Sequence, residues 1–279
     1  MPSDRLDEIR AGFAAQIARE AEILDPRLIA AFAAVPRERF LGAGPWHVLQ
    51  DDGYAVTPSD DPALVYTNSC IALDPARRIN NGEPALHMGL IAQLAPRSGD
   101  HVVQIGVGGG YYTAILAHLV QPQGRITAIE YDSEIARLGA ANLAAVPRVN
   151  VVCADGTSHD FDPADGIYVN AGASKPLALW LDKLKPAGRL IMMLTTDDWW
   201  GRILKVTRLD TGFAAALLGP CGFIPCVNGR DVASAMLLAA ALARGDTETV
   251  RSLRREPHAV DETCWMHSDG ACLSRRKLN

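Results

Sequence analysis

Two short stretches of the sequence hold side chains and backbone groups that could do chemistry. GVGGG, at residues 106–110, follows a β-branched run and precedes a helix-length segment. A glycine turn between a strand and a helix presents backbone amides to a ligand at the carboxyl edge of a sheet. INNGEPALHM, at residues 79–88, gathers two amides, a carboxylate and an imidazole around one predicted turn. The first stretch is therefore a candidate cofactor loop and the second a candidate substrate loop.

The glycine loop and two acidic residues together indicate the cofactor. The dinucleotide fingerprint G-x-G-x-x-G would need glycine at position 111, where this chain has Tyr111, so its pattern is G-x-G-x-G. Glu130 ends the second predicted strand, where a carboxylate can accept hydrogen bonds from both ribose hydroxyls. Asp155 ends the third and could accept from an adenine amino group, while Gly156 lets the ring approach the backbone. This combination predicts S-adenosylmethionine; the alternative is glycines in tight turns and acids that cap strands in solvent.

The elements that must position these residues alternate between strand and helix. From about residue 84 to 194, short β-branched runs bounded by glycine or proline predict buried strands, and helix-length segments lie between them. Such alternation favours an α/β fold with a mostly parallel sheet and helices on both faces. Residues 201–226 predict an antiparallel edge. The predicted strands are 101–106, 125–131, 149–156, 164–172 and 187–194, and the predicted helices are 111–120, 133–145 and 175–184.

The segments before residue 84 and after residue 229 are predicted to be extensions of the α/β domain. Apolar spacing predicts helices within residues 4–24 and at 26–32, and residues 41–74 are typical of loops with one or two brief strands, so residues 1–83 form a predicted N-terminal cap. The cofactor-binding domain then occupies residues 84–229. Residues 230–279 predict an Ala/Leu-rich helix, at 233–255, followed by an irregular tail.

Composition limits the partners and the location. The net charge of −5, with no basic cluster longer than RRK, argues against a nucleic-acid partner. No apolar run is long enough to span a bilayer, and the N-terminal residues lack the apolar centre of a signal peptide, which predicts a cytoplasmic protein without a membrane partner. The six scattered cysteines predict reduced thiols. The oligomeric state is left open.

The spacing of Cys264, His267 and Cys272 is that of part of a zinc knuckle. A closed structural zinc site needs four ligands, and the sequence shows no fourth nearby. We therefore expect no metal, and we expect the tail to pack Trp265 and Cys272 on the body of the protein.

Eight motifs occur in a fixed order over about residues 25–226. They are VPRERF (35–40), SGDHVVQIGVGGGYYTAILAHLV (98–120), ITAIEYDSEIARLGAANL (126–143), VNVVCADGT (149–157), ADGIYVNAGA (164–173), LKPAGRLIMML (184–194), GRILKVTR (201–208) and LGPCGFIPC (218–226). In content and order they resemble the protein-L-isoaspartate O-methyltransferases. The resemblance implies a class I, Rossmann-like methyltransferase fold, S-adenosylmethionine as cofactor with S-adenosylhomocysteine as product, and carboxyl O-methylation of a peptide or protein.

The resemblance also implies the cofactor contacts. Glu130 falls on the family's ribose carboxylate, and Tyr131 lies beside the adenine. Gln104 stands where the family commonly has Asp or Glu, which removes a negative charge near the cofactor's ammonium or sulfonium. Asn170 ends the fourth predicted strand at the same edge and is a further candidate for cofactor or substrate. The predicted cofactor contacts are Gln104, Gly106, Val107, Gly108, Gly110, Glu130, Tyr131, Asp155, Gly156 and Asn170.

The substrate loop departs from the family pattern. The family usually has a serine near the methyl acceptor, whereas Asn80 takes that place here and residues 79–88 contain no Ser or Thr. A carboxylate acceptor is ionised at neutral pH and needs no general base, so the amide of Asn80 or Asn81 could orient it. A hydroxyl or amine acceptor would need proton removal, for which His87 and Glu83 are the titratable groups of the loop. The predicted catalytic residues are Asn80, Asn81 and His87.

A structural interpretation of the same loop stays open. Asn-Gly is a common turn dipeptide, and Pro84 suits the first position of a helix. Glu83 would then complement the helix dipole. Two functional alternatives also stay open: a methyltransferase for a dedicated peptide or small metabolite, and a catalytically silent cofactor-binding protein.

Overall fold

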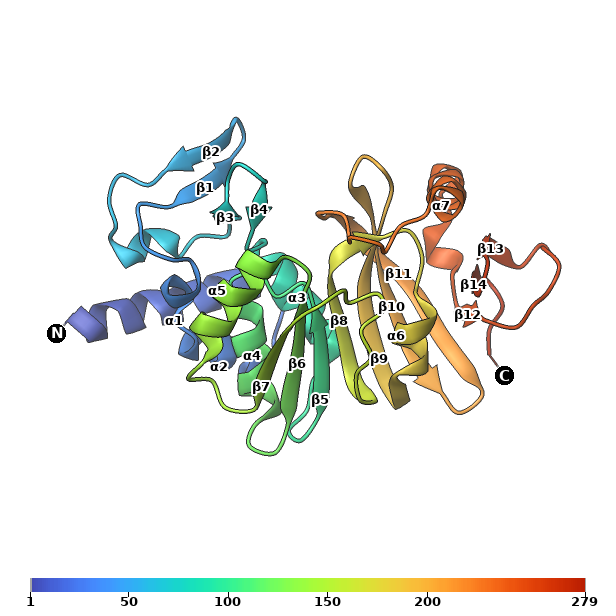
Figure 1. The fold of residues 1–279 in the computed structure, drawn as a ribbon, viewed down its shortest axis with the longest axis horizontal. Coiled ribbons are helices and arrows are strands. Elements are labelled where there is room, and N and C mark those ends of the chain that lie inside the picture. Colours follow the sequence, from blue (N-terminus) through green and yellow to red (C-terminus); the bar gives the residue numbers. More distant parts are fainter. Residues whose placement is uncertain (1, 279) are drawn as a thin grey trace. The chain divides into compact units, whose positions relative to one another are not determined.

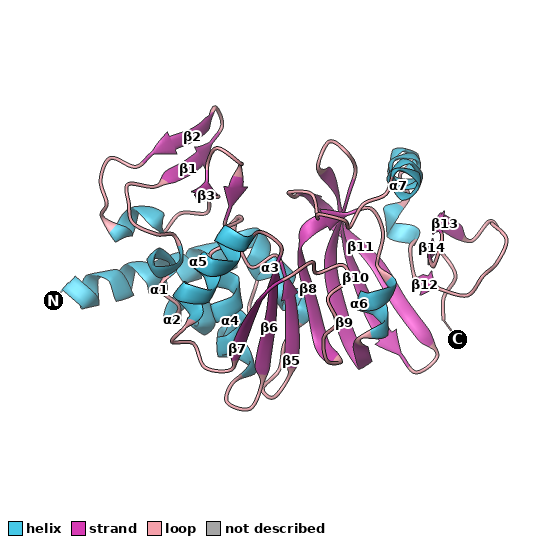
Figure 2. Ribbon diagram, in the orientation of Figure 1, coloured by secondary structure: helices cyan, strands magenta, loops and turns pink. Residues whose placement is uncertain are grey.

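The computed structural model describes residues 2–278, which divide into two compact units. Among these residues, the N-terminal unit comprises 2–99 and 107–153, and the C-terminal unit comprises 100–106 and 154–278. In the described chain, helices α1 to α5 belong to the N-terminal unit, whereas most of the strands belong to the C-terminal unit (Figures 1 and 2). No helix within residues 2–278 combines the length and apolar character needed to cross a membrane.

Capped helices build the N-terminal unit. Asp25 caps one helix by accepting a hydrogen bond from the Arg27 amide, and Pro26 takes its first position. Asp132 caps another through the Glu134 and Ile135 amides. The helices predicted at 26–32, 111–120 and 133–145 are confirmed, with small differences at their ends. The helices are α1 (Pro2–Glu20), α2 (Pro26–Ala34), α3 (Pro84–Leu94), α4 (Tyr111–Val120) and α5 (Ser133–Leu143), with short 3-10 turns at Arg37–Phe40 and Pro62–Val65.

Three pairs of short strands lie among the described residues of the N-terminal unit. Two are antiparallel, β1 (His47–Gln50) with β2 (Gly53–Val56) and β3 (Ala72–Asp74) with β4 (Ile79–Asn80). The third is the parallel pair of β6 (Arg125–Glu130) and β7 (Val149–Cys153). A small buried apolar cluster packs against the hairpins and contains Leu41, Trp46, Val65 and Ile71.

One sheet dominates the C-terminal unit. Its strands run in the order β13-β14-β12-β11-β10-β9-β8-β5, with β5, β8 and β9 parallel and the others antiparallel. The centre of β9 is fully buried from Leu190 to Leu194, as expected for a strand covered on both faces. The bounds are β5 (His101–Ile105), β8 (Ala164–Ala173), β9 (Leu184–Thr195), β10 (Trp200–Leu209), β11 (Gly212–Gly222), β12 (Ser252–Arg254), β13 (Cys264–Ser268) and β14 (Ala271–Ser274).

Two helices of this unit are shorter than predicted. Helix α6 (Ala178–Asp182) packs on β9 and fills only the centre of the predicted segment 175–184. Helix α7 (Val232–Arg244) ends where Gly245 and Asp246 take positive φ values of 76° and 51°. The predicted helix 233–255 is therefore wrong beyond Arg244, because the chain turns through a 3-10 segment (Thr247–Thr249) into β12.

The predicted irregular tail is also wrong. Strands β13 and β14 form a hairpin around Asp269 and Gly270, with Gly270 at a φ of 71°. Asp-Gly is a favoured hairpin dipeptide because both turn positions tolerate positive φ. The predicted burial of Trp265 and Cys272 is confirmed, since each is 1% exposed, and the Trp265 Nε1 donates to Asp246 Oδ1 at 2.9 Å.

Candidate active site

The glycine loop of the N-terminal unit can be built only from glycine at its centre. Gly108 and Gly110 have φ values of 58° and 94°, which side-chain-bearing residues rarely adopt. A Cβ on Gly109 would lie 2.1 Å from the Phe40 carbonyl oxygen. The loop therefore packs its backbone directly against neighbouring backbone, and it leads into α4 at the buried Tyr111.

Glu130 is bonded to this loop. Its Oε2 accepts hydrogen bonds from the amides of Val107 at 2.8 Å and Gly108 at 3.1 Å, and its Oε1 accepts from the Asp132 amide at 3.2 Å. An ionised carboxylate offers about four lone-pair sites, so acceptor capacity remains for a further donor. Glu130 thus holds the backbone of the cofactor loop in addition to its predicted contact with a ribose.

An exposed tyrosine follows Glu130 in the sequence, and an arginine forms ion pairs with acidic residues close by. Tyr131, which follows β6, is 53% exposed. Arg77 forms ion pairs with Asp74 at 2.5 Å, with Glu134 at 3.1 Å and with Asp132. The Ile135 amide and the Arg77 guanidinium hold the pKa of Asp132 below its usual range against the effect of burial. Arg77 therefore ties the turn between β3 and β4 to the start of α5.

In the C-terminal unit, Asp155 and Gly156 are held by several hydrogen bonds. Asp155 Oδ1 accepts from the amide and hydroxyl of Thr157 at 2.8 and 2.7 Å, and its Oδ2 accepts from Asn228 Nδ2 at 2.8 Å. Burial alone would raise the pKa of Asp155, but these bonds outweigh it and leave the pKa lowered. A Cβ on Gly156 would lie 2.5 Å from Ile105 Cγ2, so the position excludes a side chain. The carboxylate is ionised and fixed in place.

Two amide side chains meet at the Gly106 carbonyl. The buried Gln104 donates from Nε2 at 3.1 Å, and Asn170 donates from Nδ2 at 3.4 Å. Asn170 Oδ1 is buried and lacks a hydrogen-bond partner among the described residues. An unsatisfied buried acceptor costs about 1–3 kcal/mol, so this oxygen suits a ligand that brings a donor, such as the ammonium of S-adenosylmethionine.

The loop at residues 79–88 is a turn that leads into α3. Asn80 Oδ1 accepts from the Gly82 amide at 2.9 Å. Gly82 has a φ of 75°. Pro84 is the first residue of α3, so the prediction of a helix start is confirmed. Glu83 lies at the N-cap of the same helix and accepts from Asn68 Nδ2 at 2.9 Å.

Asn81 belongs to a buried polar network. Its Oδ1 accepts from the Ile71 amide at 2.8 Å and from Arg37 Nη2 at 3.5 Å, and the residue is 8% exposed. The fully buried Arg37 also donates to three backbone carbonyls, those of Val65, Thr67 and Ser69, at 2.6–2.8 Å. The Oδ1 of Asn81 therefore has a structural role. Its buried Nδ2 lacks a hydrogen-bond partner among the described residues, so the predicted role of this amide as a donor to a carboxylate stays a prediction.

His87 is unsuited to the predicted role of general base. It is 3% exposed, not at the surface, and its ring stacks on Tyr112 with centroids 3.7 Å apart and an interplanar angle of 4°. Burial, with a smaller effect of the Arg37 charge, lowers the pKa of His87 to about 3. An imidazole with this pKa stays neutral at pH 7 and is a weak base. A Cβ on Gly82 would lie 2.1 Å from its Nε2, so His87 packs under the loop's turn.

The family model for protein-L-isoaspartate(D-aspartate) O-methyltransferase matches residues 13–231. This match covers most of the chain and includes the glycine loop, Glu130, Asp155 and Asn170. The chain belongs to this family. The protein-L-isoaspartate O-methyltransferase family supplies the class I, Rossmann-like fold that the sequence predicts, and the parallel strands β5, β8 and β9 with their antiparallel continuation agree with it.

Relatives in this family are similar over most of their length. The protein-L-isoaspartate O-methyltransferase 2 of Marinobacter nauticus is 31% identical over 211 residues, which cover 74% of this chain and 87% of that protein. The protein-L-isoaspartate O-methyltransferase of Aeropyrum pernix is 28% identical over 201 residues, which cover 70% of each chain.

Solved structures of the family agree in fold. A protein-L-isoaspartate O-methyltransferase structure matches with a TM-score of 0.62 at 20% identity, over 90% of this chain and 74% of that chain. A Plasmodium falciparum protein assigned the same activity, in complex with S-adenosyl-L-homocysteine, matches with a TM-score of 0.64 at 14% identity, over 78% and 97% of the respective chains.

Sequence reasoning missed several residues that hold the site of this family member. Arg37 lies inside the quoted motif VPRERF, but nothing in the motif shows that its guanidinium binds carbonyls about 30 residues away. Asn228 contacts Asp155 from a distant loop, and Arg77 joins three acids from two segments. The motif VPRERF was the only sequence signal for these residues, and it marked Arg37 without showing its contacts. The contacts of Asn228 and Arg77 depend on tertiary structure.

Proposed function

We propose that this protein transfers a methyl group from S-adenosylmethionine to the carboxylate of an isoaspartyl or D-aspartyl residue in a protein or peptide. The observation that carries the proposal is the family match over residues 13–231, within which Glu130 binds the cofactor loop. The described substrate-loop residues support a carboxylate acceptor in particular.

The residues that the family resemblance points to would hold the cofactor. The carboxylate of Glu130 would accept from the ribose hydroxyls, with Tyr131 beside the adenine. Asp155 would accept from the adenine amino group, and Asn170 Oδ1 would accept from the ammonium. S-adenosylmethionine, when bound, supplies an electrophilic methyl group on a sulfonium. The protein's contribution is to hold the acceptor in line with that methyl group and to exclude water.

Acid-base properties favour a carboxylate as acceptor. Because the pKa of His87 is lowered to about 3, this residue is a weak base for a hydroxyl or amine acceptor at neutral pH, which leaves Glu83 as the other titratable group of the loop. A carboxylate with an ordinary pKa near 4 is already ionised and needs orientation only. We propose that Asn80 gives this orientation through its amide N–H groups, since its side chain is half-buried at the turn, whereas Asn81 is buried.

A radiolabel assay tests this function. The purified protein is incubated with methyl-labelled S-adenosylmethionine and an isoaspartyl peptide, in parallel with the same peptide containing ordinary aspartate. Label should enter the isoaspartyl peptide alone and be released as methanol in mild base, as a methyl ester requires. If the protein binds the cofactor but labels neither peptide, isoaspartyl methylation is wrong.

A second candidate is methylation of a dedicated peptide or small metabolite. It is favoured by the substrate loop, which has Asn80 in the place of the family's serine, and by β12, β13 and β14, which lie beyond the residues that the family model matches. A panel of carboxylate-bearing peptides and metabolites with labelled cofactor separates the two candidates. A silent cofactor-binding protein is the third, and turnover on any acceptor that Glu130→Ala abolishes would exclude it.

Three predictions made from the sequence remain proposals. They are the cytoplasmic location, the division into segments 1–83, 84–229 and 230–279, and the absence of a nucleic-acid or membrane partner.

A further inference from the structure

Four potential metal ligands converge at the end of the C-terminal unit. Cys264 and His267 lie on β13, and Cys272 lies on β14 directly opposite His267 in the hairpin register. The fourth, which the sequence did not reveal, is His258 on the loop between β12 and β13. Their four ligand atoms all lie within 4.8 Å of one another. The sequence showed no fourth ligand near these three residues, and the structure supplies His258 as a candidate.

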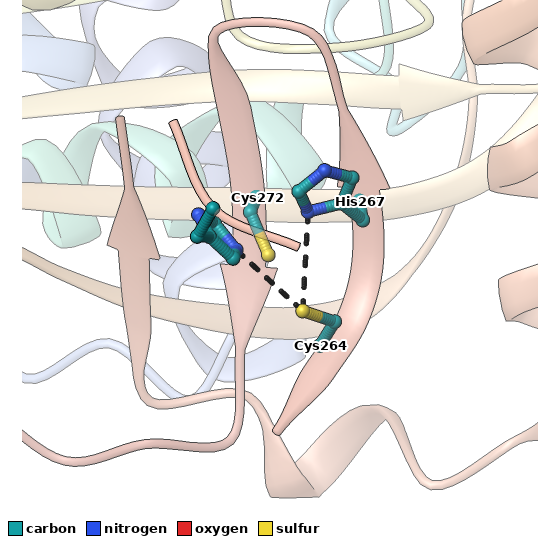
Figure 3. A group of neighbouring side chains, drawn as sticks. Cys264, His267 and Cys272 are labelled. Atoms are coloured by element: carbon teal, nitrogen blue, oxygen red, sulfur yellow. Dashed lines mark hydrogen bonds between the residues drawn. The ribbon is translucent and has the colours of Figure 1, made fainter. Parts of the chain in front are cut away.

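Individual distances in this cluster suit a small tetrahedral ion. Cys264 Sγ lies 3.6 Å from His258 Nε2 and 3.9 Å from His267 Nδ1 (Figure 3). In a tetrahedral zinc site, bond lengths of about 2.3 Å to sulfur and 2.0–2.1 Å to nitrogen place neighbouring ligand atoms roughly 3.3–3.8 Å apart. The side chains would need to move by only a few tenths of an ångström at these pairs.

The orientation of His258 is that of a metal ligand. Its Nδ1 lies 2.8 Å from the Glu256 carbonyl oxygen, and because a carbonyl only accepts, Nδ1 carries the proton. Nε2 then presents a lone pair toward Cys264. A histidine that binds a metal commonly donates its other N–H to a carbonyl in this way, which fixes the ring and the tautomer. The imidazoles of His258 and His267 meet edge to face, with centroids 4.6 Å apart, and their ligand nitrogens lie within 4.8 Å of each other.

The Asp261 turn holds the side chain of Cys264. The Asp261 amide lies 3.4 Å from Cys264 Sγ and donates to it, and the Cys264 thiol donates to Asp261 Oδ1 at 3.5 Å. The turn is kept in place by the hydrogen bond from the Cys264 amide to the Asp261 carbonyl at 3.0 Å and by the ion pair of Arg254 with Asp261 at 3.0 Å. The backbone around the cluster is thus organised by contacts that do not depend on the four ligands.

We propose that His258, Cys264, His267 and Cys272 bind one Zn²⁺ ion as a structural site. Two thiolates and two imidazoles are a ligand set that Zn²⁺ prefers, and four protein ligands leave no open position for substrate. The ion would attach the loop at residues 255–263 to the β13–β14 hairpin. The site lies outside residues 13–231, so it is separate from the residues that the family model matches.

Metal content and spectroscopy of the full chain test the site. Protein purified under reducing conditions should hold one zinc per chain by elemental analysis. After removal of zinc, added Co²⁺ should give the intense d–d bands of tetrahedral cobalt and a sulfur-to-cobalt charge-transfer band. Cys264→Ser and His267→Asn should lose most of the metal, whereas the matched controls Cys153→Ser and His118→Gln, at exposed positions outside the cluster, should keep it.

The cobalt spectrum of the wild-type protein keeps the proposal falsifiable even if a ligand variant does not fold. Reduced wild-type protein that takes up neither Zn²⁺ nor Co²⁺ would overturn the site. Zinc retained in full by folded Cys264→Ser and His267→Asn would place the metal elsewhere and overturn it equally. A Cys264–Cys272 disulfide found by mass spectrometry, together with no zinc under reducing conditions, would also refute the proposal.

Discussion

The imidazole of His87 lies flat on the ring of Tyr112, with centroids 3.7 Å apart. Both side chains also approach Gly82: the Tyr112 hydroxyl donates to the Gly82 carbonyl at 3.2 Å, and His87 Nε2 occupies the space where a Cβ of Gly82 would stand. Both side chains therefore pack against the turn at Gly82 in the predicted substrate loop. A neutral His87 is therefore part of the folded structure and not of the proton chemistry.

Acid should destabilise the protein through His87. Its pKa is lowered to about 3 in the folded state from 6.5, so below pH 6.5 the unfolded chain binds a proton that the folded protein does not. The stability contributed by the neutral ring is present above pH 6.5 and is lost as the pH falls toward 3, at up to about 1.4 kcal/mol per pH unit. Urea unfolding at pH 7 and pH 5 measures this loss.

The matched variants are His87→Phe, which keeps a ring on Tyr112 but cannot titrate, and His118→Gln at an exposed position. His87→Phe should show a smaller loss of stability between the two pH values, whereas His118→Gln should behave like the wild type. An equal loss in wild type and His87→Phe would assign the acid sensitivity to other groups.

Replacement of Glu130 should weaken cofactor binding. Glu130→Gln keeps the shape but places an N–H donor where one carboxylate oxygen accepts backbone amides, and it removes the charge from those hydrogen bonds. Charge-assisted hydrogen bonds contribute about 1.5–3 kcal/mol, so affinity for S-adenosylhomocysteine should fall roughly ten-fold or more by calorimetry. Glu8→Gln, on the exposed face of α1, is the control. Unchanged affinity in Glu130→Gln would remove Glu130 from the cofactor site.

The two asparagines of the substrate loop should differ in their effects. Asn80→Ala should retain cofactor affinity and most of the stability while kcat on the acceptor falls about ten-fold, as expected for loss of an orienting hydrogen bond of about 1.4 kcal/mol. Asn81→Ala should instead destabilise the fold by about 1–3 kcal/mol, because the buried Ile71 amide loses the side-chain oxygen to which it donates. Thermal unfolding and steady-state kinetics on both variants measure these effects.

Asn80→Ser extends this comparison, since it restores the hydroxyl that the family usually has. It should retain activity on an isoaspartyl peptide. If Asn80→Ala has wild-type kcat and Asn80→Ser gains nothing, the side chain at position 80 serves the turn alone.

Two glycine-to-alanine changes should have opposite results. A Cβ on Gly109 would meet the Phe40 carbonyl oxygen at 2.1 Å, so Gly109→Ala must displace the cofactor loop. Both cofactor affinity and Tm should fall. Gly89→Ala, inside α3 with nothing within 4 Å of the new Cβ, should stabilise by about 0.5–1 kcal/mol through helix propensity. A Gly109→Ala protein with unchanged affinity and Tm would contradict the close approach of these backbones.

Local patterns predicted the strands of the α/β part well. The run at 101–106 became β5 and the run at 164–172 became β8, because β-branched residues bounded by glycine or proline carry a strong local signal. Local signals were less reliable after residue 230. The Ala/Leu-rich composition suggested a helix to 255, but Gly245 ends it, and the Asp269-Gly270 turn signal was present and overlooked.

Site residues divide in the same way. Glu130 is the last residue of β6 and Asp155 lies two residues after β7, so spacing alone could place both at the ends of strands. Asn81 and His87 could not be judged from sequence, because their roles depend on Arg37 and Tyr112, which reach them only in the folded chain. His258 was missed as the fourth ligand because the loop that brings it to Cys264 has no sequence pattern of its own.

Arg37 binds the segment before the substrate loop through the carbonyls of Val65, Thr67 and Ser69, which every residue type possesses. The segment can therefore exchange its side chains without losing its anchor. Because the anchor uses main-chain oxygens, substitutions at these three positions would leave the hydrogen-bond acceptors of Arg37 in place.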